Sequence, residues 1–288
     1  MIILKIKNNA GPGNQMFMFA RAYALAKKYN HKIIIVSEIS GYSVRQNILQ
    51  YLCLDKKLVK RIIRLDWTKN QYIFRFIRKL IFDYILKLPC FIQIFQSASD
   101  SRVFLPIKPL SPKKIYVVDG YWECHQYFDE YRENLIDQFV PQYPLSKTVT
   151  ELIDQIANED SLVIHVRKGD FNEFGRLIDD DYYLQAYLDF KKKHTNIKLY
   201  ILTEDDDVFA YWHQRFSAKR IIFNTENRYL DEWYAMTKCK YHIIANSTYS
   251  WWSSYICNSD CKEIIYPSYE QYKMAEKTNT IQMYKNYY

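Results

Sequence analysis

Residues 161–174 read SLVIHVRKGDFNEF, and this stretch decides the fold because an apolar strand runs directly into a charged loop. The continuous apolar run that opens it is typical of a strand buried on both faces, as in a parallel sheet. His165 and Arg167 fall on one face of this strand, because side chains alternate between the two faces. A buried strand that ends in Arg167, Lys168 and Asp170 indicates a functional site beyond its carboxyl end.

The second half of the chain repeats this pattern, with short apolar segments separated by amphipathic helical patterns. The expected strands are Leu162–Val166, Leu199–Leu202, Ile221–Phe223, His242–Ala245 and Glu263–Tyr266, and the expected helices are 181–194, 206–216, 231–240 and about 250–258. This alternation predicts an α/β fold in which helices cover both faces of a parallel sheet. Ligands of such sheets bind at the carboxyl ends of the strands.

The first half opens with a second α/β pattern. A strand at Ile2–Ile6 leads through the glycine turn GPG into a helix expected from about Gln15 to Tyr29, and a strand at Ile33–Val36 follows. The glycine turn permits a close backbone approach to a ligand, although it lacks the spacing of a dinucleotide fingerprint and the lysine of a P-loop. Further along, we expect a strand at Ile115–Val118 and a helix near Thr148–Asn158.

Two prolines in VPQYPLS (140–146) mark the expected hinge between domains. A chain of 288 residues is long enough for two modest domains. We therefore expect an N-terminal domain at 1–142, with a basic helical insertion at about 56–98, and a C-terminal domain at 143–288. With 49% hydrophobic and 25% charged residues, the composition excludes a disordered chain.

The positive charge is concentrated in the middle of the chain. Between Lys56 and Gln96 there are ten Lys and Arg residues and two Asp residues. The net charge of this stretch therefore equals that of the whole chain, +8. It is either a solvated helical face or a surface that meets anionic lipid or an anionic substrate. No apolar run approaches the roughly 18 residues needed to span a bilayer.

Three loops follow three expected strands of the second half: HVRKGD (165–170), TEDD (203–206) and NSTYSWW (246–252). In a parallel sheet these loops emerge along one edge. The planar fork of an arginine binds diphosphate oxygens in bidentate fashion, and a helix N-terminus complements the same negative charge. A carboxylate accepts the paired N–H donors of guanine. Together these residue types predict a site for a nucleoside diphosphate.

Each residue also has a structural interpretation when it is taken alone. The residues that could simply cap helices are Asp205, Ser247, Thr248 and Ser250. His165 could be a buried histidine, and Arg167 could form a structural ion pair with Asp170. Because these residues occur together at three strand ends, a nucleotide-binding site is favoured over the structural interpretations.

Five motifs in order resemble glycosyltransferase family 11, the α-1,2-fucosyltransferases, over the whole chain except the basic middle. The motifs are GPGNQMFMFARAYALA (11–26), DGYWECHQYF (119–128), IHVRKGDF (164–171), LYILTEDD (199–206) and CKYHIIANSTYSWWSSYI (239–256). The departures from the family pattern are Lys168, Phe171, Thr203, Glu204, Ser253 and Ser254. None of them removes a group that the diphosphate site requires.

The resemblance implies a GT-B-like architecture, with two Rossmann-like domains facing across a cleft. It also implies transfer of fucose from GDP-fucose with inversion, with no required metal and no cofactor. The donor is expected mainly in the C-terminal domain, and the acceptor on the N-terminal side. The expected acceptor is a galactose-terminated oligosaccharide or lipid-linked glycan, and its identity stays open.

The expected substrate-binding residues are Gly13, Asn14, His165, Arg167, Asp205, Asn246, Ser247, Thr248 and Ser250. Arg167 is expected to stabilise the departing GDP, helped by Ser250 and by backbone amides near Gly13–Asn14. His165 and Asp205 are expected to hold the guanosine. The catalytic candidates are Arg167 and Asp170; Asp170 is the best candidate for the general base, with Glu173 behind it, and either could instead orient Arg167.

Two functions of other classes are alternatives to transfer. A carbohydrate-binding or scaffold protein with the same fold and no transfer activity would also explain the 17% aromatic content. Nucleic-acid binding is disfavoured, because the positive charge lies in one segment and no nucleic-acid motif occurs.

Six scattered cysteines indicate reduced thiols. We expect a cytoplasmic enzyme, peripheral at the inner face of a bacterial inner membrane, with the basic segment in contact with anionic lipid.

Overall fold

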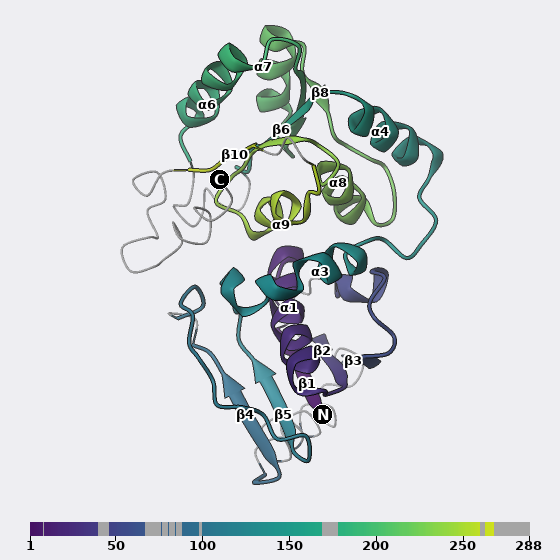
Figure 1. Cartoon of the computed structure of the whole chain (residues 1–288). Coiled ribbons are helices and arrows are strands. Elements are labelled where there is room, and N and C mark those ends of the chain that lie inside the picture. Colours follow the sequence, from purple (N-terminus) through teal and green to yellow (C-terminus); the bar gives the residue numbers. More distant parts are fainter. Residues whose placement is uncertain are drawn as a thin grey trace. The chain divides into compact units, whose positions relative to one another are not determined.

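The computed structural model describes residues 1–7, 9–39, 46–66, 76, 80, 84, 88–97, 100–168, 178–259 and 263–267. The chain divides into two compact units, an N-terminal unit at Met1–Phe139 and a C-terminal unit at Val140–Tyr288. The division falls at the first residue of the proline-containing stretch 140–146. Each unit is an α/β structure with its own parallel sheet (Figure 1).

The N-terminal unit has a five-stranded parallel sheet in the order β3-β2-β1-β5-β4. The strands are β1 (Ile2–Ile6), β2 (Ile33–Ile39), β3 (Val59–Asp66), β4 (Phe91–Phe95) and β5 (Ile115–Asp119). The helical elements are α1 (Pro12–Tyr29), α3 (Arg132–Gln138) and the 3₁₀ turns η1 (Ile48–Tyr51), η4 (His125–Tyr127) and η5 (Asp129–Tyr131). β1 is the central strand, with Ile2 level with Ile33 on one side and with Tyr116 on the other.

Helix α1 begins three residues earlier than the sequence predicted, at Pro12 rather than about Gln15. Proline is well suited to the first helical position because its missing N–H would have no partner there. The buried side chain of Gln15 forms hydrogen bonds to the loops around the start of this helix. Its Nε2 donates to the carbonyls of Ala10 and Gln46 at 2.9 Å each, and its Oε1 accepts from the N–H of Ile48 at 2.9 Å.

The prediction of a basic helical insertion at about 56–98 is wrong at both of its ends. Val59–Asp66 forms β3 and Phe91–Phe95 forms β4, each paired in parallel with a strand of the sheet. Both are edge strands, whose backbone groups are satisfied by a neighbouring strand that local sequence does not reveal. Apart from the single positions 76, 80 and 84, the stretch 67–87 lies outside the described residues.

The C-terminal unit has a five-stranded parallel sheet in the order β10-β9-β6-β7-β8. Its strands are β6 (Ser161–His165), β7 (Lys198–Leu202), β8 (Lys219–Arg220), β9 (Tyr241–Ile243) and β10 (Glu263–Ile265). Its helices are α4 (Lys147–Asn158), α6 (Asp180–Lys193), α7 (Asp206–Phe216), α8 (Arg228–Met236) and α9 (Thr248–Ile256). The alternation expected for the second half is confirmed, but the strand predicted at Ile221–Phe223 lies earlier, since β8 ends at Arg220.

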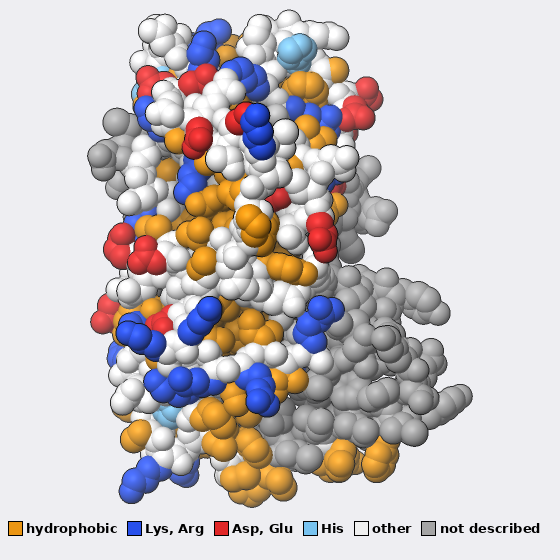
Figure 2. Space-filling model, turned by 90° about the vertical axis from the view of Figure 1, so that its right-hand side faces the viewer, with side chains coloured by type: hydrophobic (Ala, Val, Ile, Leu, Met, Phe, Trp, Pro, Cys, Tyr) orange, Lys and Arg blue, Asp and Glu red, His pale blue; other side chains and the backbone are white. Residues whose placement is uncertain are grey.

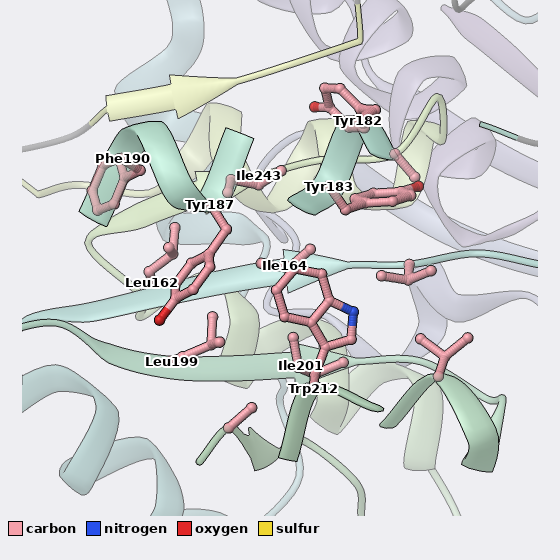
Figure 3. Packing of buried hydrophobic residues seen from close by; sticks show 14 of the residues in the cluster. Leu162, Ile164, Tyr182, Tyr183, Tyr187, Phe190, Leu199, Ile201, Trp212 and Ile243 are labelled. Atoms are coloured by element: carbon pink, nitrogen blue, oxygen red, sulfur yellow. The ribbon is translucent and has the colours of Figure 1, made fainter. Parts of the chain in front are cut away.

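Aromatic side chains of two helices fill the core on one face of this sheet. Tyr187 from α6 and Trp212 from α7 meet edge to face, with ring centroids 5.6 Å apart, close to apolar residues of β6 and β7 (Figure 3). Every residue of β6 is buried, as its continuous apolar run predicted. This buried central strand leads directly to Arg167, two residues beyond its end.

The order of the strands locates the crevice of the C-terminal sheet. From β6 the chain continues outward to β7 and β8, and then returns to β9 on the other side of β6. The boundary between β6 and β9 is therefore the topological switch point, where ligands of open α/β sheets bind. In the N-terminal sheet the same point lies between β1 and β5.

Candidate nucleotide-binding site

Arg167 and Ser247 meet at the switch point of the C-terminal sheet. Arg167 follows the end of β6 and Ser247 follows the end of β9, 80 residues further along the chain. One guanidinium nitrogen of Arg167, Nη1, donates to the hydroxyl oxygen of Ser247 at 3.3 Å. Arg167 is partly exposed and Ser247 is buried. The structure thus brings together two of the predicted loops, with a cation beside a helix N-terminus.

Ser247 also begins helix α9. Its side chain accepts a hydrogen bond from the N–H of Tyr249 at 3.3 Å, so it is the N-cap of this helix. Asn246 and Thr248 beside it are partly exposed. The positive end of the helix dipole therefore lies next to the Arg167 cation, and both favour an anion.

Ser250 has a different place from the one the sequence predicted. Its side chain is fully buried, and its hydroxyl lies within bonding distance of two backbone carbonyls, those of Ala245 at 3.4 Å and of Ser247 at 3.3 Å. A hydroxyl that donates inside the first turn of α9 stabilises the helix start. In this arrangement Ser247, rather than Ser250, is the hydroxyl that accompanies Arg167.

His165 lies at the end of β6 and is buried, with 5% of its surface exposed. Its ring packs against that of Tyr249, with centroids 5.6 Å apart. Burial, reinforced by the neighbouring Arg167 cation, lowers the pKa of His165 to about 3. The imidazole is therefore neutral at pH 7, and its buried Nδ1 has no hydrogen-bond partner among the described residues.

Helix α6 fixes both strand ends through its first turn, which the sequence analysis did not identify. The hydroxyl of Tyr182 donates to the carbonyl of Ile244 just after β9, at 3.0 Å. The hydroxyl of Tyr183 is hydrogen-bonded to the backbone of Arg167. Lys168, the other cation of the loop after β6, forms an ion pair with Asp180 at 2.7 Å. The helical pattern predicted α6, but not which strand ends its tyrosines would contact.

The loop after β7 is held by its own helix cap and by Arg220. Asp205 is the N-cap of α7, and its Oδ1 accepts from the N–H of Val208 at 3.0 Å. Arg220 donates to Asp206 at 2.6 Å and to the carbonyl of Thr203 at 3.1 Å. The capping interpretation of Asp205 is thus confirmed, and any contact with a nucleoside would be an additional role.

A second polar cluster beside this loop also escaped the sequence analysis. Arg228 and Glu232 of α8 form an ion pair at 2.7 Å, and burial raises the pKa of Glu232. The charge of Glu204, in the loop after β7, raises the pKa of the Tyr229 hydroxyl. The hydroxyl of Tyr249 in turn donates to the carbonyl of Tyr229, so α8 and α9 are tied together next to His165. Only the i, i+4 spacing of Arg228 and Glu232 could have signalled this cluster in the sequence.

The remaining predicted site residues belong to the other unit or lie outside the described residues. Gly13 and Asn14 belong to the first turn of α1 in the N-terminal unit, where Gly13 is buried and Asn14 is partly exposed. Asp170 and Glu173, the two candidates for the general base, lie outside the described residues. Within the part of the chain that the structure describes, no group of three His, Cys, Asp or Glu side chains is placed to hold a metal ion.

Comparison with known proteins assigns the chain to a family. The sequence profile of Glycosyl transferase family 11 matches residues 105–287, more than half of the chain. The chain belongs to glycosyltransferase family 11. The resemblance inferred from the five motifs is thereby confirmed, and the chain is a glycosyltransferase of this fucosyltransferase-like family.

Two relatives of this family 11 chain come from Escherichia coli. An alpha-1,2-colitosyltransferase is 28% identical over 280 residues, covering 93% of this chain and 92% of the relative. The O-antigen biosynthesis glycosyltransferase WbnK is 24% identical over 290 residues, covering 90% of this chain and 92% of the relative. These matches extend the family relation through most of the N-terminal unit.

Solved structures show the fold class of the family 11 chain. NodZ alpha-1,6-fucosyltransferase soaked with GDP-fucose is 15% identical with a TM-score of 0.54, covering 94% of this chain and 96% of that one. Fucosyltransferase NodZ from Bradyrhizobium gives a TM-score of 0.50 at 15% identity, covering 88% and 91%. The expected fold class, α/β and GT-B-like with two Rossmann-like domains, is confirmed.

Proposed function

We propose that this glycosyltransferase moves L-fucose from GDP-fucose to the 2-hydroxyl of a terminal β-galactoside, forming an α-1,2 linkage with inversion. The C-terminal unit binds the donor and the N-terminal unit provides the acceptor side. The observation that carries the proposal is the contact of Arg167 with Ser247 at the switch point of the C-terminal sheet. The GDP-fucose in the NodZ structure and the alpha-1,2 linkage in the name of the colitosyltransferase support the donor and the linkage.

The proposed chemistry follows from where charge develops. The galactose oxygen attacks the anomeric carbon while the bond to the β-phosphate breaks, and GDP leaves with the electron pair. Arg167 and the N-terminus of α9 stabilise this growing negative charge, so they supply the electrostatic assistance that a metal ion provides in other transferases. The hydroxyl proton passes to a general base, for which Asp170 remains our candidate from its position in the motif.

The nucleoside is the second part of the donor. We assign its recognition to Asp205 and to the neighbourhood of His165, at the ends of β7 and β6. A buried neutral imidazole cannot repel a cation or attract an anion, so His165 contributes shape and hydrogen bonding rather than charge. Arg228 and Glu204 add charged groups at the edge of the same loops.

A second donor is favoured by one specific observation. The alpha-1,2-colitosyltransferase is 28% identical over nearly the whole chain. Colitose is L-fucose without its 3-hydroxyl, so the two activated sugars present the same diphosphate and the same anomeric carbon. An activated colitose as the donor is therefore the second candidate, with the same linkage and the same role for Arg167.

Transfer of radiolabel from GDP-fucose to lactose and to other β-galactosides tests the proposal. We expect Arg167→Ala to abolish transfer while the protein stays folded, because alanine removes the planar cation that is proposed to hold the diphosphate. Arg167→Lys should also lose most activity, since a point charge does not replace the planar fork. Arg215→Ala, an exposed arginine on the last turn of α7, is the matched control and should retain activity.

The outcomes separate the candidates. Near-wild-type transfer by Arg167→Ala would exclude the diphosphate role of this residue. GDP binding without any release of GDP from GDP-fucose, with or without an acceptor, would favour a carbohydrate-binding or scaffold protein. Transfer from an activated colitose but not from GDP-fucose would select the second donor.

A further inference from the structure

A cavity in the N-terminal unit has no part in the proposed donor site. It has a volume of about 190 Å³, and it lies between α1, the loop at 104–107 and the turns η4 and η5. Cavities that bind drug-sized molecules are larger, with volumes of roughly 300–1,000 Å³. The cavity therefore limits its ligand to a small one, and it is formed within one unit.

Arg21 lines this cavity although it is 94% buried, since only 6% of its surface is exposed. Its guanidinium lies over two aromatic rings, 4.2 Å from the ring centre of Tyr127 and 5.1 Å from that of Trp122. Among the described residues, no hydrogen bond or ion pair reaches this guanidinium, and its buried Nε has no partner. Burial lowers the pKa of Arg21 to about 10, so it is still a cation at pH 7.

The rings below Arg21 are held in place. The hydroxyl of Tyr127 accepts from the N–H of Leu105 at 2.7 Å and donates to the carbonyl of Val103 at 2.9 Å. Gln96 contacts the same hydroxyl at 3.2 Å. The hydroxyl of Tyr127 is thus already hydrogen-bonded to its neighbours. The Arg21 guanidinium above the ring therefore has hydrogen-bond donors left for another partner. Buried arginines almost always have such a partner, because an unpaired buried cation is costly.

The other walls of the cavity define the kind of ligand. Lys28 adds a second cation, whereas Glu130, which interacts with the Tyr131 hydroxyl, is the acidic group on the wall. Tyr29 and Tyr131 contribute aromatic surface, and Phe104 stands at the rim with 42% of its surface exposed. Aromatic faces pack on the apolar faces of sugar rings, and the guanidinium binds carboxylate or phosphate.

We propose that this cavity binds an anionic pyranose, a sugar ring that carries a carboxylate or a phosphate, with its anion on Arg21 and Lys28. The site is separate from the donor site and does not depend on the proposed transfer reaction. A glycosyltransferase with such a site would favour acceptor glycans that contain a uronate or a phosphorylated sugar.

Titration calorimetry on the full-length protein tests this site with galacturonate, galactose 1-phosphate and neutral galactose as probes. We expect at least one of the two anions to bind at least tenfold more tightly than galactose, and the stronger of the two identifies the anion. Arg21→Met should weaken that binding at least tenfold. Lys28→Met, at an exposed position that leaves the buried cluster intact, should weaken it severalfold, and Arg61→Met on the exposed edge strand β3 should not change it.

GDP binding by the same variants separates this proposal from the donor site. Arg21→Met and Lys28→Met should bind GDP as the wild type does, which also shows that they are folded. Equal affinities for galactose and both anions in the wild type would overturn the proposal, as would unchanged anion binding in both variants. If Arg21→Met fails to fold, the result with Lys28→Met decides.

Discussion

At the scale of single residues, two nearby side chains at the end of β6 have opposite electrostatic roles. Arg167 is partly exposed and charged, whereas His165, two positions earlier, is buried and neutral. Strand alternation predicts that both side chains share one face, but it does not predict that one of them is sealed from water. Burial depends on tertiary contacts that the local sequence does not show. The ring that packs on His165 belongs to Tyr249, which lies more than 80 positions further along the chain.

The low pKa of His165 predicts a loss of stability in acid. Its folded-state pKa of about 3 lies below the ordinary value of 6.5, so the unfolded chain binds a proton that the folded chain excludes. This contribution is fully present above pH 6.5 and is lost as the pH falls toward 3, by about 2 kcal/mol between pH 7 and pH 5. His165→Gln should lose less stability over this interval, as measured by urea unfolding at each pH.

The exposed histidine of α7 provides the control for this measurement. His213→Gln should follow the wild-type dependence on pH, because His213 lies at the surface. If the stability of His165→Gln falls between pH 7 and pH 5 as steeply as that of the wild type, His165 is not buried in its neutral form in solution.

At the scale of elements, the start of α9 combines a helix cap with the anion site. The hydroxyl oxygen of Ser247 accepts one hydrogen bond from the backbone N–H of Tyr249 and another from Arg167. A change at this position therefore alters the stability of α9 and the position of the cation together. Ser146, the N-cap of α4, accepts from the N–H of Val149 at 3.4 Å and contacts none of the predicted site residues.

This pair of caps leads to a prediction for two variants. Ser247→Ala and Ser146→Ala should each destabilise the protein by about 1 kcal/mol, but only Ser247→Ala should also weaken GDP binding. Ser247→Asp should keep the cap and weaken GDP binding further, because its carboxylate would neutralise Arg167. Urea unfolding and calorimetry with GDP measure the two effects. Equal GDP affinities for the two alanine variants would contradict the link between cap and site.

Elements with strong local patterns were predictable, and edge elements were not. Helices α6 and α7 begin and end within about one residue of the positions expected from their periodicity and capping residues. In β3, by contrast, Lys60, Arg61 and Arg64 interrupt the apolar residues, which made a basic helix the simpler interpretation. The strand forms because β2 offers it a partner edge. No local signal in the sequence encodes that neighbour.

At the scale of the whole molecule, the charge is divided unequally between the two units. Residues 1–139 contain 22 Lys and Arg against 11 Asp and Glu, a net charge of +11, whereas residues 140–288 contain 18 against 21, a net charge of −3. In the lower half of Figure 2, where the N-terminal unit is drawn, blue Lys and Arg side chains lie among orange hydrophobic ones. The net positive charge of the N-terminal unit thus suits an anionic surface as a partner.

We propose that this unit also contacts anionic membrane lipid. None of the described helices is long and apolar enough to cross a membrane. Large hydrophobic side chains are nevertheless exposed within the basic stretch, with exposed fractions of 68% for Phe76, 58% for Tyr84 and 65% for Phe95. Apolar side chains among cations are typical of a surface that lies on anionic lipid.

Co-sedimentation with lipid vesicles measures this contact. The protein should bind vesicles that contain phosphatidylglycerol at low salt and should bind pure phosphatidylcholine vesicles weakly. Replacing Phe76 and Tyr84 by serine should reduce binding severalfold, whereas Ile222→Ser, at a 42% exposed position of the C-terminal unit, should not. Failure of the wild type to bind the anionic vesicles would rule out the proposed contact.

The central position of the first strand in each sheet has a consequence for how the chain is made. On the ribosome, β1 and β6 emerge before every strand that will flank them. The C-terminal sheet can then grow outward from β6, first through β7 and β8 and later through β9 and β10. In the N-terminal sheet, β4 leaves the ribosome before β5, the strand that joins it to β1. Nascent β4 must therefore wait with its backbone unpaired, so chaperone contact during synthesis should concentrate on the interval between Phe91 and Asp119.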